Sequence, residues 1–132
     1  MKLRKKIVTL SLMLLLAFTF CGCYASSYSA LMYVRTSHSD SCSMSFSEFN
    51  GTEAFKMKWT GDGTGHVRYH AKLDSGTMTV YYDTDGEKKE WFTVKPGEEL
   101  NDVGLDLKQG SFYIIVESNG KAADGSLSFE LE

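Results

Sequence analysis

The stretch GHVRYHAKLDSGTMTVYYD, residues 65–83, decides the fold. Apolar side chains occupy every second position from Val67 to Leu73 and again from Met78 to Tyr82. This period of two is typical of β-strands that bury one face, and Asp74-Ser75-Gly76 supplies a turn between the two runs. The stretch therefore predicts two consecutive strands.

The same alternation continues on both sides of this stretch, and no run has a helical period. It is least regular between Glu98 and Lys108 and clearest in three runs: Phe55, Met57, Trp59; Phe112, Ile114, Val116; and Leu127, Phe129, Leu131. Short Gly-containing turns such as Asn50-Gly51 and Asn119-Gly120 separate the runs. We therefore predict an all-β fold over residues 41–132, a single antiparallel β-sandwich of jelly-roll or Greek-key type with about seven or eight strands.

The first 22 residues predict an export signal. Basic residues at positions 2, 4, 5 and 6 precede an apolar run of 14 residues, Ile7–Phe20. A membrane-spanning helix needs roughly 20 residues, so this run has the length of a signal-peptide core instead. Cleavage after Gly22 would leave Cys23 at the N-terminus with its thiol free to take a lipid. We predict a lipoprotein signal peptide over residues 1–22 and lipidation at Cys23, with secretion after cleavage at Ala25 or Ala30, or an uncleaved anchor, as alternatives.

Two parts of the chain resemble bacterial lipoproteins. Phe20-Cys21-Gly22-Cys23 is similar to a lipobox in its Gly and its second Cys, and differs where Phe20 and Cys21 replace the usual Leu and Ala or Ser. From Phe49 to the end, Gly-bounded strands such as Gly76–Val80, Gly110–Ile114 and Gly125–Phe129 resemble small cell-surface lipoproteins of Gram-positive-type bacteria, which are mostly of uncharacterised function. The resemblance implies a β-sandwich anchored by lipid at the outer face of the cytoplasmic membrane or at the cell surface, and no catalytic residue.

Charge argues against a nucleic-acid partner. Removal of residues 1–22 takes away four of the 14 basic side chains and none of the 17 acidic ones, so the remainder carries a formal charge of −7. An acidic surface repels phosphate polymers, whose binding needs clustered Lys and Arg. The expected partners are the membrane, through the N-terminal lipid, and a glycan or a protein.

Serine is abundant between Ala25 and Ser47 and occupies every odd position from Ser37 onward. We predict a Ser-rich flexible spacer over residues 23–40. The alternation of Cys42, Met44 and Phe46 then predicts a half-buried edge strand. Once Cys21 has left and Cys23 carries lipid, Cys42 is the only thiol of the domain, so no disulfide framework is expected.

Four basic residues form the only positive row of the domain. His66, Arg68, His70 and Lys72 alternate with apolar residues, so they share the outward face of one strand. Because His66 and His70 lie roughly 13 Å apart in a strand, they cannot share one zinc ion. The row predicts an exposed face offset by acidic neighbours, or a contact to an acidic ligand through Arg68 and Lys72.

Two other features suggest ligand contacts. The turn from Asp83 to Glu87 carries three carboxylates around Gly86, which predicts either a self-capped hairpin turn or a Ca²⁺ site. Tyr81 and Tyr113 fall out of phase with the core residues of their strands, so their rings are predicted to face outward, where they either pack or stack on a sugar.

No enzymatic signature is present: the sequence has no nucleophile elbow, no His-Glu-x-x-His and no phosphate-binding Gly loop that opens a helix. We therefore predict a non-catalytic protein without metal or cofactor. Its expected function is to bind a cell-envelope glycan or an exported protein, and the alternative is a structural or accessory subunit without a ligand of its own.

Overall fold

The computed structural model describes residues 24–132, which form strands and turns and contain no helix. The strands are β1 (Ser27–Leu31), β2 (Val34–Ser37), β3 (Ser41–Trp59), β4 (Gly65–Ser75), β5 (Met78–Asp83), β6 (Lys89–Val94), β7 (Glu99–Leu107), β8 (Gly110–Ser118) and β9 (Ala122–Leu131). All pair antiparallel, and the main hydrogen-bonded path runs β6-β5-β8-β3-β9-β4-β7. The predicted all-β antiparallel fold is confirmed, and the predicted signal peptide and Cys23 lie outside the described residues.

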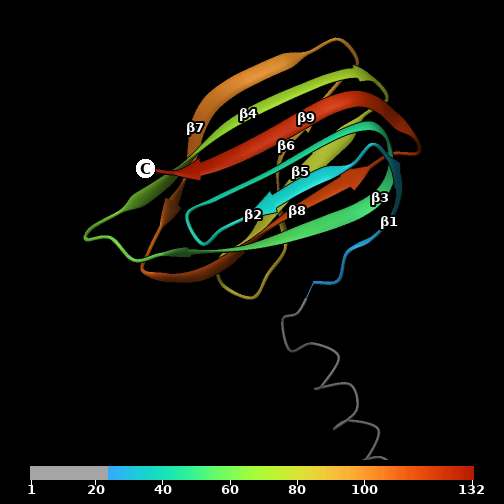
Figure 1. Ribbon diagram of the computed structural model, residues 1–132. Helices are drawn as coiled ribbons and strands as arrows, with labels where there is room; N and C mark the ends of the chain where they lie inside the picture. The colour runs from blue at the N-terminus through green and yellow to red at the C-terminus, as the bar shows by residue number, and fades with distance from the viewer. Residues whose placement is uncertain (1–23) are drawn as a thin grey trace, which may run out of the picture.

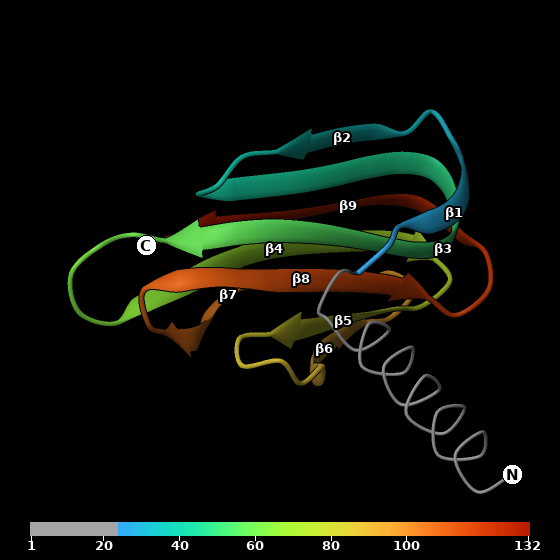
Figure 2. The ribbon, with the colours of Figure 1, turned by 90° about the horizontal axis from the view of Figure 1, so that it is seen from below.

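The fold is built from long arms, each of which bends once. β3 is one continuous strand of 19 residues, and each of the pairs β4–β5, β6–β7 and β8–β9 follows a neighbouring arm around the same bend. The first half of β3 pairs with β9, and its second half pairs with β8. Each arm therefore contributes to two layers, which Figures 1 and 2 show folded over one another.

The bend in β3 corrects one detail of the sequence analysis. Asn50-Gly51 was expected to form a turn between two strands, whereas the strand continues through it. Gly51 has φ +138, and a Cβ atom on it would lie 2.2 Å from the Ser27 carbonyl oxygen. Only glycine fits a bend this close to the backbone of β1.

The folded arms enclose one apolar core. Phe49, Phe55 and Phe129 are at most 1% exposed, and the Cys42 sulfur lies 3.6 Å from the Met57 sulfur. Cys42 and Met57 come from opposite ends of β3, so this contact shows how completely the arm folds back on itself. Burial raises the pKa of the Cys42 thiol to about 12, which excludes it as a reactive nucleophile in the folded state. The buried core residues of the described part of the chain all lie between Cys42 and Phe129, so residues 24–132 have a hydrophobic core of their own.

The predicted flexible spacer is wrong for most of its length. β1 and β2 lie inside residues 23–40 and pair antiparallel with β3, from Ser27 opposite Thr52 to Ser37 opposite Cys42. β3 is consequently an interior strand and not the predicted edge. The serine-rich composition was misleading because small polar side chains also suit the outer face of an exposed strand.

A buried carboxylate holds this added arm in place. Glu53 is 1% exposed, and its oxygens accept hydrogen bonds from Ser26 Oγ, Tyr33 Oη and the Ala54 amide. Arg35 Nε lies 3.4 Å from the carboxylate, and the guanidinium also covers the Phe55 ring at 4.7 Å. Because a buried charge is tolerated only when it is paired and hydrogen-bonded, this network fixes β1 and β2 on one open side of the sandwich.

None of the described residues belongs to a helix long and apolar enough to cross a membrane.

Candidate functional site

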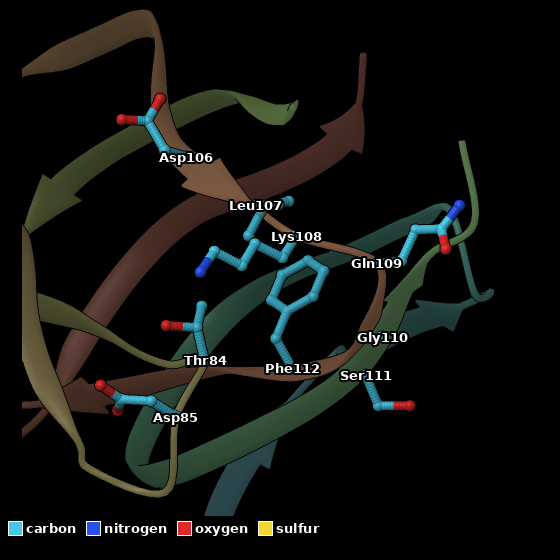
Figure 3. Close-up of a pocket in the computed structure, with 9 residues that line it drawn as sticks. All are labelled: Thr84, Asp85, Asp106, Leu107, Lys108, Gln109, Gly110, Ser111 and Phe112. Atoms are coloured by element: carbon cyan, nitrogen blue, oxygen red, sulfur yellow. The ribbon is translucent and has the colours of Figure 1, made fainter. Parts of the chain in front are cut away.

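The candidate site is a pair of adjoining cavities at one end of the sandwich. The first, of about 280 Å³, lies between the β5–β6 and β7–β8 turns, whose side chains face one another in Figure 3; its lining includes Thr84, Asp85, Asp106 and Gln109, with Phe112 behind them. The second, of about 440 Å³, is lined by Tyr82, Thr84, Lys89, Glu90, Trp91, Leu105 and Asp106. Thr84 and Asp106 line both, so we treat the two cavities as one groove and call it the end groove.

An irregularity in strand pairing places the aromatic wall of the end groove. Val80 pairs with Phe92 and Tyr81 pairs with Glu90, so Trp91 is one extra residue in β6. Such a bulge twists a strand and redirects its side chains. Here Trp91 and Phe92 pack with Tyr69, whose ring stacks on Phe92 at 4.1 Å and meets the indole edge-on at 4.9 Å.

Two features of β7 fit the strand to this indole. A Cβ atom on Gly104 would lie 2.9 Å from the Trp91 indole nitrogen, so the ring lies directly on the backbone of β7. The next residue, Leu105, has φ +62, a conformation that costs a branched side chain roughly 1–2 kcal/mol. His66 Nδ1 lies 2.8 Å from the Leu105 carbonyl oxygen and donates to it, which holds the strand in this shape. Backbone strain of this kind tends to occur at functional sites, and here it shapes a groove wall.

The polar wall of the end groove supplies mainly acceptors. The Asp85 and Asp106 side chains are 55% and 88% exposed, and Asp106 Oδ1 lies 3.5 Å from His66 Nδ1. The hydrogen bond from Lys89 and that from the Glu87 amide lower the pKa of Asp85, so it is ionised at neutral pH. Lys89 Nζ lies 3.1 Å from Asp85 and compensates its charge, and Lys108 also lines the first cavity.

The turn that carries Asp85 is a self-capped hairpin turn. Asp83 is 5% exposed, and its Oδ1 accepts the amides of Asp85 and Gly86 at 3.2 and 2.6 Å. Its other oxygen accepts the Tyr24 hydroxyl at 2.6 Å. These partners use the Asp83 carboxylate, and no three acidic, His or Cys side chains in the described part of the chain are grouped to hold a metal ion. The observations favour the hairpin alternative over Ca²⁺ binding.

Arg68 and Lys72 lie on the outer face of β4 and line neither cavity of the end groove. Both are exposed, as the alternation predicted. Arg68 Nε lies 2.7 Å from Glu132, and His70 Nε2 lies 2.9 Å from Glu99, so acidic neighbours offset the row. Lys72 borders a separate open hollow of about 430 Å³ with Met32 and Asp124. Contact of Arg68 or Lys72 with a ligand stays a prediction.

Tyr81 on β5 lies opposite the buried Ile115 of β8, and Tyr113 lies two residues before Ile115, so both rings are on the same face of this layer. Their rings are partly covered: Lys88 lies 4.3 Å above the Tyr81 ring and is paired with Glu117, and Tyr24 packs edge-on against Tyr113 at 5.2 Å. The two tyrosines therefore have structural partners already. Their role in ligand contact also stays a prediction.

Sequence reasoning missed the end groove. A regular strand phase places an indole on one face or the other, whereas the bulge at Trp91 breaks that phase. The signal that was available is the adjacent aromatic pair Trp91-Phe92, which breaks the alternation of β6. The facing residues of β7 lie in the segment with the least regular pattern.

A scan of protein-family profiles and a search of curated proteins give no match. Among solved structures, the chain is similar to TmCBM61 in complex with β-1,4-galactotriose, with 19% identity, a TM-score of 0.43 and coverage of 76% of this chain and 69% of that one. It is also similar to CBM6cm-2 from Cellvibrio mixtus lichenase 5A in complex with cellotriose, with 11% identity, a TM-score of 0.44 and coverage of 80% and 88%. A variant of CBM29-2, a family 29 carbohydrate binding module, is similar with 13% identity, a TM-score of 0.41 and coverage of 83% of this chain and 86% of that one. All three TM-scores are below 0.5, so the site is argued from this chain's own residues.

Proposed function

We propose that this protein is a non-catalytic glycan-binding domain, held by a lipid at the outer side of the cytoplasmic membrane or at the cell surface, and that the end groove is its binding site. The observation that carries the proposal is the half-buried Trp91 in a cavity of about 440 Å³, whose other lining residues are Leu105 and the polar or charged side chains of Tyr82, Thr84, Lys89, Glu90 and Asp106. Ligand cavities of 300–1,000 Å³ with an apolar wall and a few polar groups are typical of small-molecule sites. Sugar rings match this surface because they present C–H groups on one face and hydroxyls around the rim.

The polarity of the end groove favours uncharged sugars. Asp85, Asp106 and Glu90 accept hydrogen bonds from sugar hydroxyls, and hydrogen bonds to a charged acceptor are the strong ones. The same carboxylates repel a uronic acid or a phosphorylated glycan, because like charges at close range cost energy. We therefore expect neutral hexoses or N-acetylated sugars to bind and acidic polysaccharides to be rejected.

A calorimetric titration tests this proposal. Residues 24–132 are titrated with N-acetylglucosamine tetramer, with neutral hexose oligomers and with oligogalacturonate. Binding of a neutral oligosaccharide that Trp91→Ala abolishes supports the end groove as the site. Tyr113→Ala, at one of the residues that the sequence analysis predicted to contact a ligand, serves as the matched control on the outer face of β8. Binding that Tyr113→Ala abolishes and Trp91→Ala leaves intact would move the site to the outer face of β8.

Tyr24, the first described residue, is held against the folded domain, so a lipid on Cys23 would be joined to the domain without a flexible spacer. Tyr24 is fixed to the outer face of the layer that contains β5 and β8, by its contacts to Asp83 and Tyr113. Cys23 directly precedes Tyr24 in the sequence. A lipid on Cys23 would hold this face close to the membrane, and Lys56 and Lys58, both exposed, belong to the same face. Their charge suits anionic headgroups.

Mass spectrometry of the mature protein tests the anchor separately from the glycan site. The expected product begins at Cys23 and carries diacylglyceryl, and Cys23→Ser should release the protein from the membrane fraction. A mature chain that begins after Ala25 or Ala30 without lipid would refute the anchor. The end groove is untouched by that result.

A protein partner is the second candidate, because β1 and β2 present an apolar edge. In that case no oligosaccharide of the panel binds, and the domain acts as an accessory subunit.

A further inference from the structure

The two free edges of the folded sheet differ sharply in chemistry. One edge is the β6–β7 arm, which ends the main path, and the other is the β1–β2 arm, which pairs only with β3 among the described strands. Figure 2 shows β2 at the rim of the sandwich with no strand beyond it. Free strand edges present unpaired amide and carbonyl groups, and natural proteins protect them with charges, prolines or bulges.

The β6–β7 edge has these protective features. It contains the bulge at Trp91, the proline at position 96, and many charged residues: Lys89, Glu90, Lys95, Glu98, Glu99, Asp102 and Asp106. A second copy of the chain approaching this edge would meet mainly like charge. We therefore expect this edge to stay single.

The β1–β2 edge has few of them: its backbone bends at Met32, with φ +49, and its strands contain one charged residue, Arg35. Residues 24–34, YASSYSALMYV, contain neither a charged residue nor a proline. The first charge of the arm, Arg35, is drawn inward to Glu53 and Phe55. This is the reverse of the protection expected on an exposed edge.

The same arm carries most of the exposed apolar surface. Tyr28, Leu31, Met32 and Val34 are 42%, 57%, 84% and 62% exposed, and Val103 on β7 is the only other large hydrophobic residue of the described chain that reaches 36%. Apolar side chains gathered on one segment mark an interaction surface more often than scattered ones do. The backbone edge further specifies that its occupant is a β-strand.

We propose that two copies of this protein pair through their β1–β2 arms as a symmetric dimer. Antiparallel pairing about a two-fold axis places the same uncharged segment on both sides, so the contact is self-complementary. It brings Leu31, Met32 and Val34 of the two copies together. With a charge of −7 on residues 23–132, this edge is also where two copies meet the least repulsion. The dimer does not depend on glycan binding.

Sedimentation equilibrium of residues 24–132 between micromolar and millimolar concentration tests the dimer. We expect reversible dimerisation, and Leu31→Lys should weaken it at least tenfold because it places two ammonium groups at the contact. Val103→Lys is the matched control, since it adds the same charge at an exposed apolar site on the other edge, and it should leave the dimer intact. A monomer at all concentrations would overturn the proposal, and so would a dimer that Leu31→Lys does not weaken.

Crosslinking locates the contact without relying on a destabilising change. Met32→Cys adds an accessible thiol in a domain whose other thiol, Cys42, is 2% exposed. Under a mild disulfide-forming oxidant, Met32→Cys should give a covalent dimer in high yield, and Val103→Cys should not. If Val103→Cys crosslinks as efficiently as Met32→Cys, the copies meet by random collision and the proposed pairing is wrong.

Discussion

Removal of one hydroxyl group tests how the β1–β2 arm is held. Tyr33 donates to Glu53 Oε2, and the other described partners of this carboxylate contact Oε1. Tyr33→Phe therefore leaves one oxygen of a 1%-exposed carboxylate without a partner, while the ring keeps its packing against Phe49 at 5.8 Å. A hydrogen bond to a charged group contributes about 1.5–3 kcal/mol, and the loss of a partner for a buried charge falls at the upper end.

The assay is urea unfolding of residues 24–132, followed by tryptophan fluorescence. With a denaturant slope of roughly 1–3 kcal/mol/M, a loss of about 3 kcal/mol lowers the urea midpoint by roughly 1–3 M. Tyr28→Phe is the matched control: its ring lies 4.9 Å from that of Tyr33, but its hydroxyl makes no hydrogen bond to another described residue. We expect less than about 0.5 kcal/mol for Tyr28→Phe. Equal midpoints for the two variants would refute the assignment of the Glu53 network as the support of the arm.

Three further predictions follow from the packing. Burial raises the pKa of Cys42 to about 12 from an ordinary 9.0, so a thiol reagent at pH 8 should modify Cys42 only after unfolding. The protonated thiol stabilises the fold fully below pH 9, and this contribution is lost as the pH rises toward 12. The free energy of unfolding of the Cys42→Ala variant should therefore fall less steeply with pH in the alkaline range. Gly104→Val should displace Trp91, shift its emission and weaken glycan binding at least tenfold; unchanged emission would mean that the ring does not rest on β7. Burial, helped by Asp83, raises the pKa of Tyr24 to about 12, so Tyr24→Phe should remove one tyrosine from the late part of an absorbance titration; loss of an early-titrating tyrosine instead would contradict its contacts.

The sequence was sufficient to predict the strands that bury one face. Alternation from Val67 to Leu73 and from Phe112 to Val116 follows directly from the pleat of a strand, and the structure buries those residues as expected. The sequence pattern did not predict contacts between residues far apart in the chain. Asn50-Gly51 forms a bend within one strand because the backbone of β1 lies against it. Ser27 begins a strand because it pairs with Thr52, 25 residues further along the chain.

The site was hidden for a related reason. Tyr81 and Tyr113 were found because their phase is regular, but regular phase alone does not show which rings a neighbour covers. Trp91 reaches the end groove through a bulge, and β7 receives it at Gly104, so the groove exists only once two strands with irregular patterns are placed together.

The most direct test of the account is the affinity of residues 24–132 for neutral oligosaccharides, measured beside the Trp91→Ala variant. The account predicts saturable binding of at least one neutral or N-acetylated oligosaccharide, with quenching or a shift of tryptophan fluorescence, and its loss in Trp91→Ala. Retained affinity in Trp91→Ala, or no binding by the unmodified domain to any member of the panel, would contradict the end groove as a glycan site.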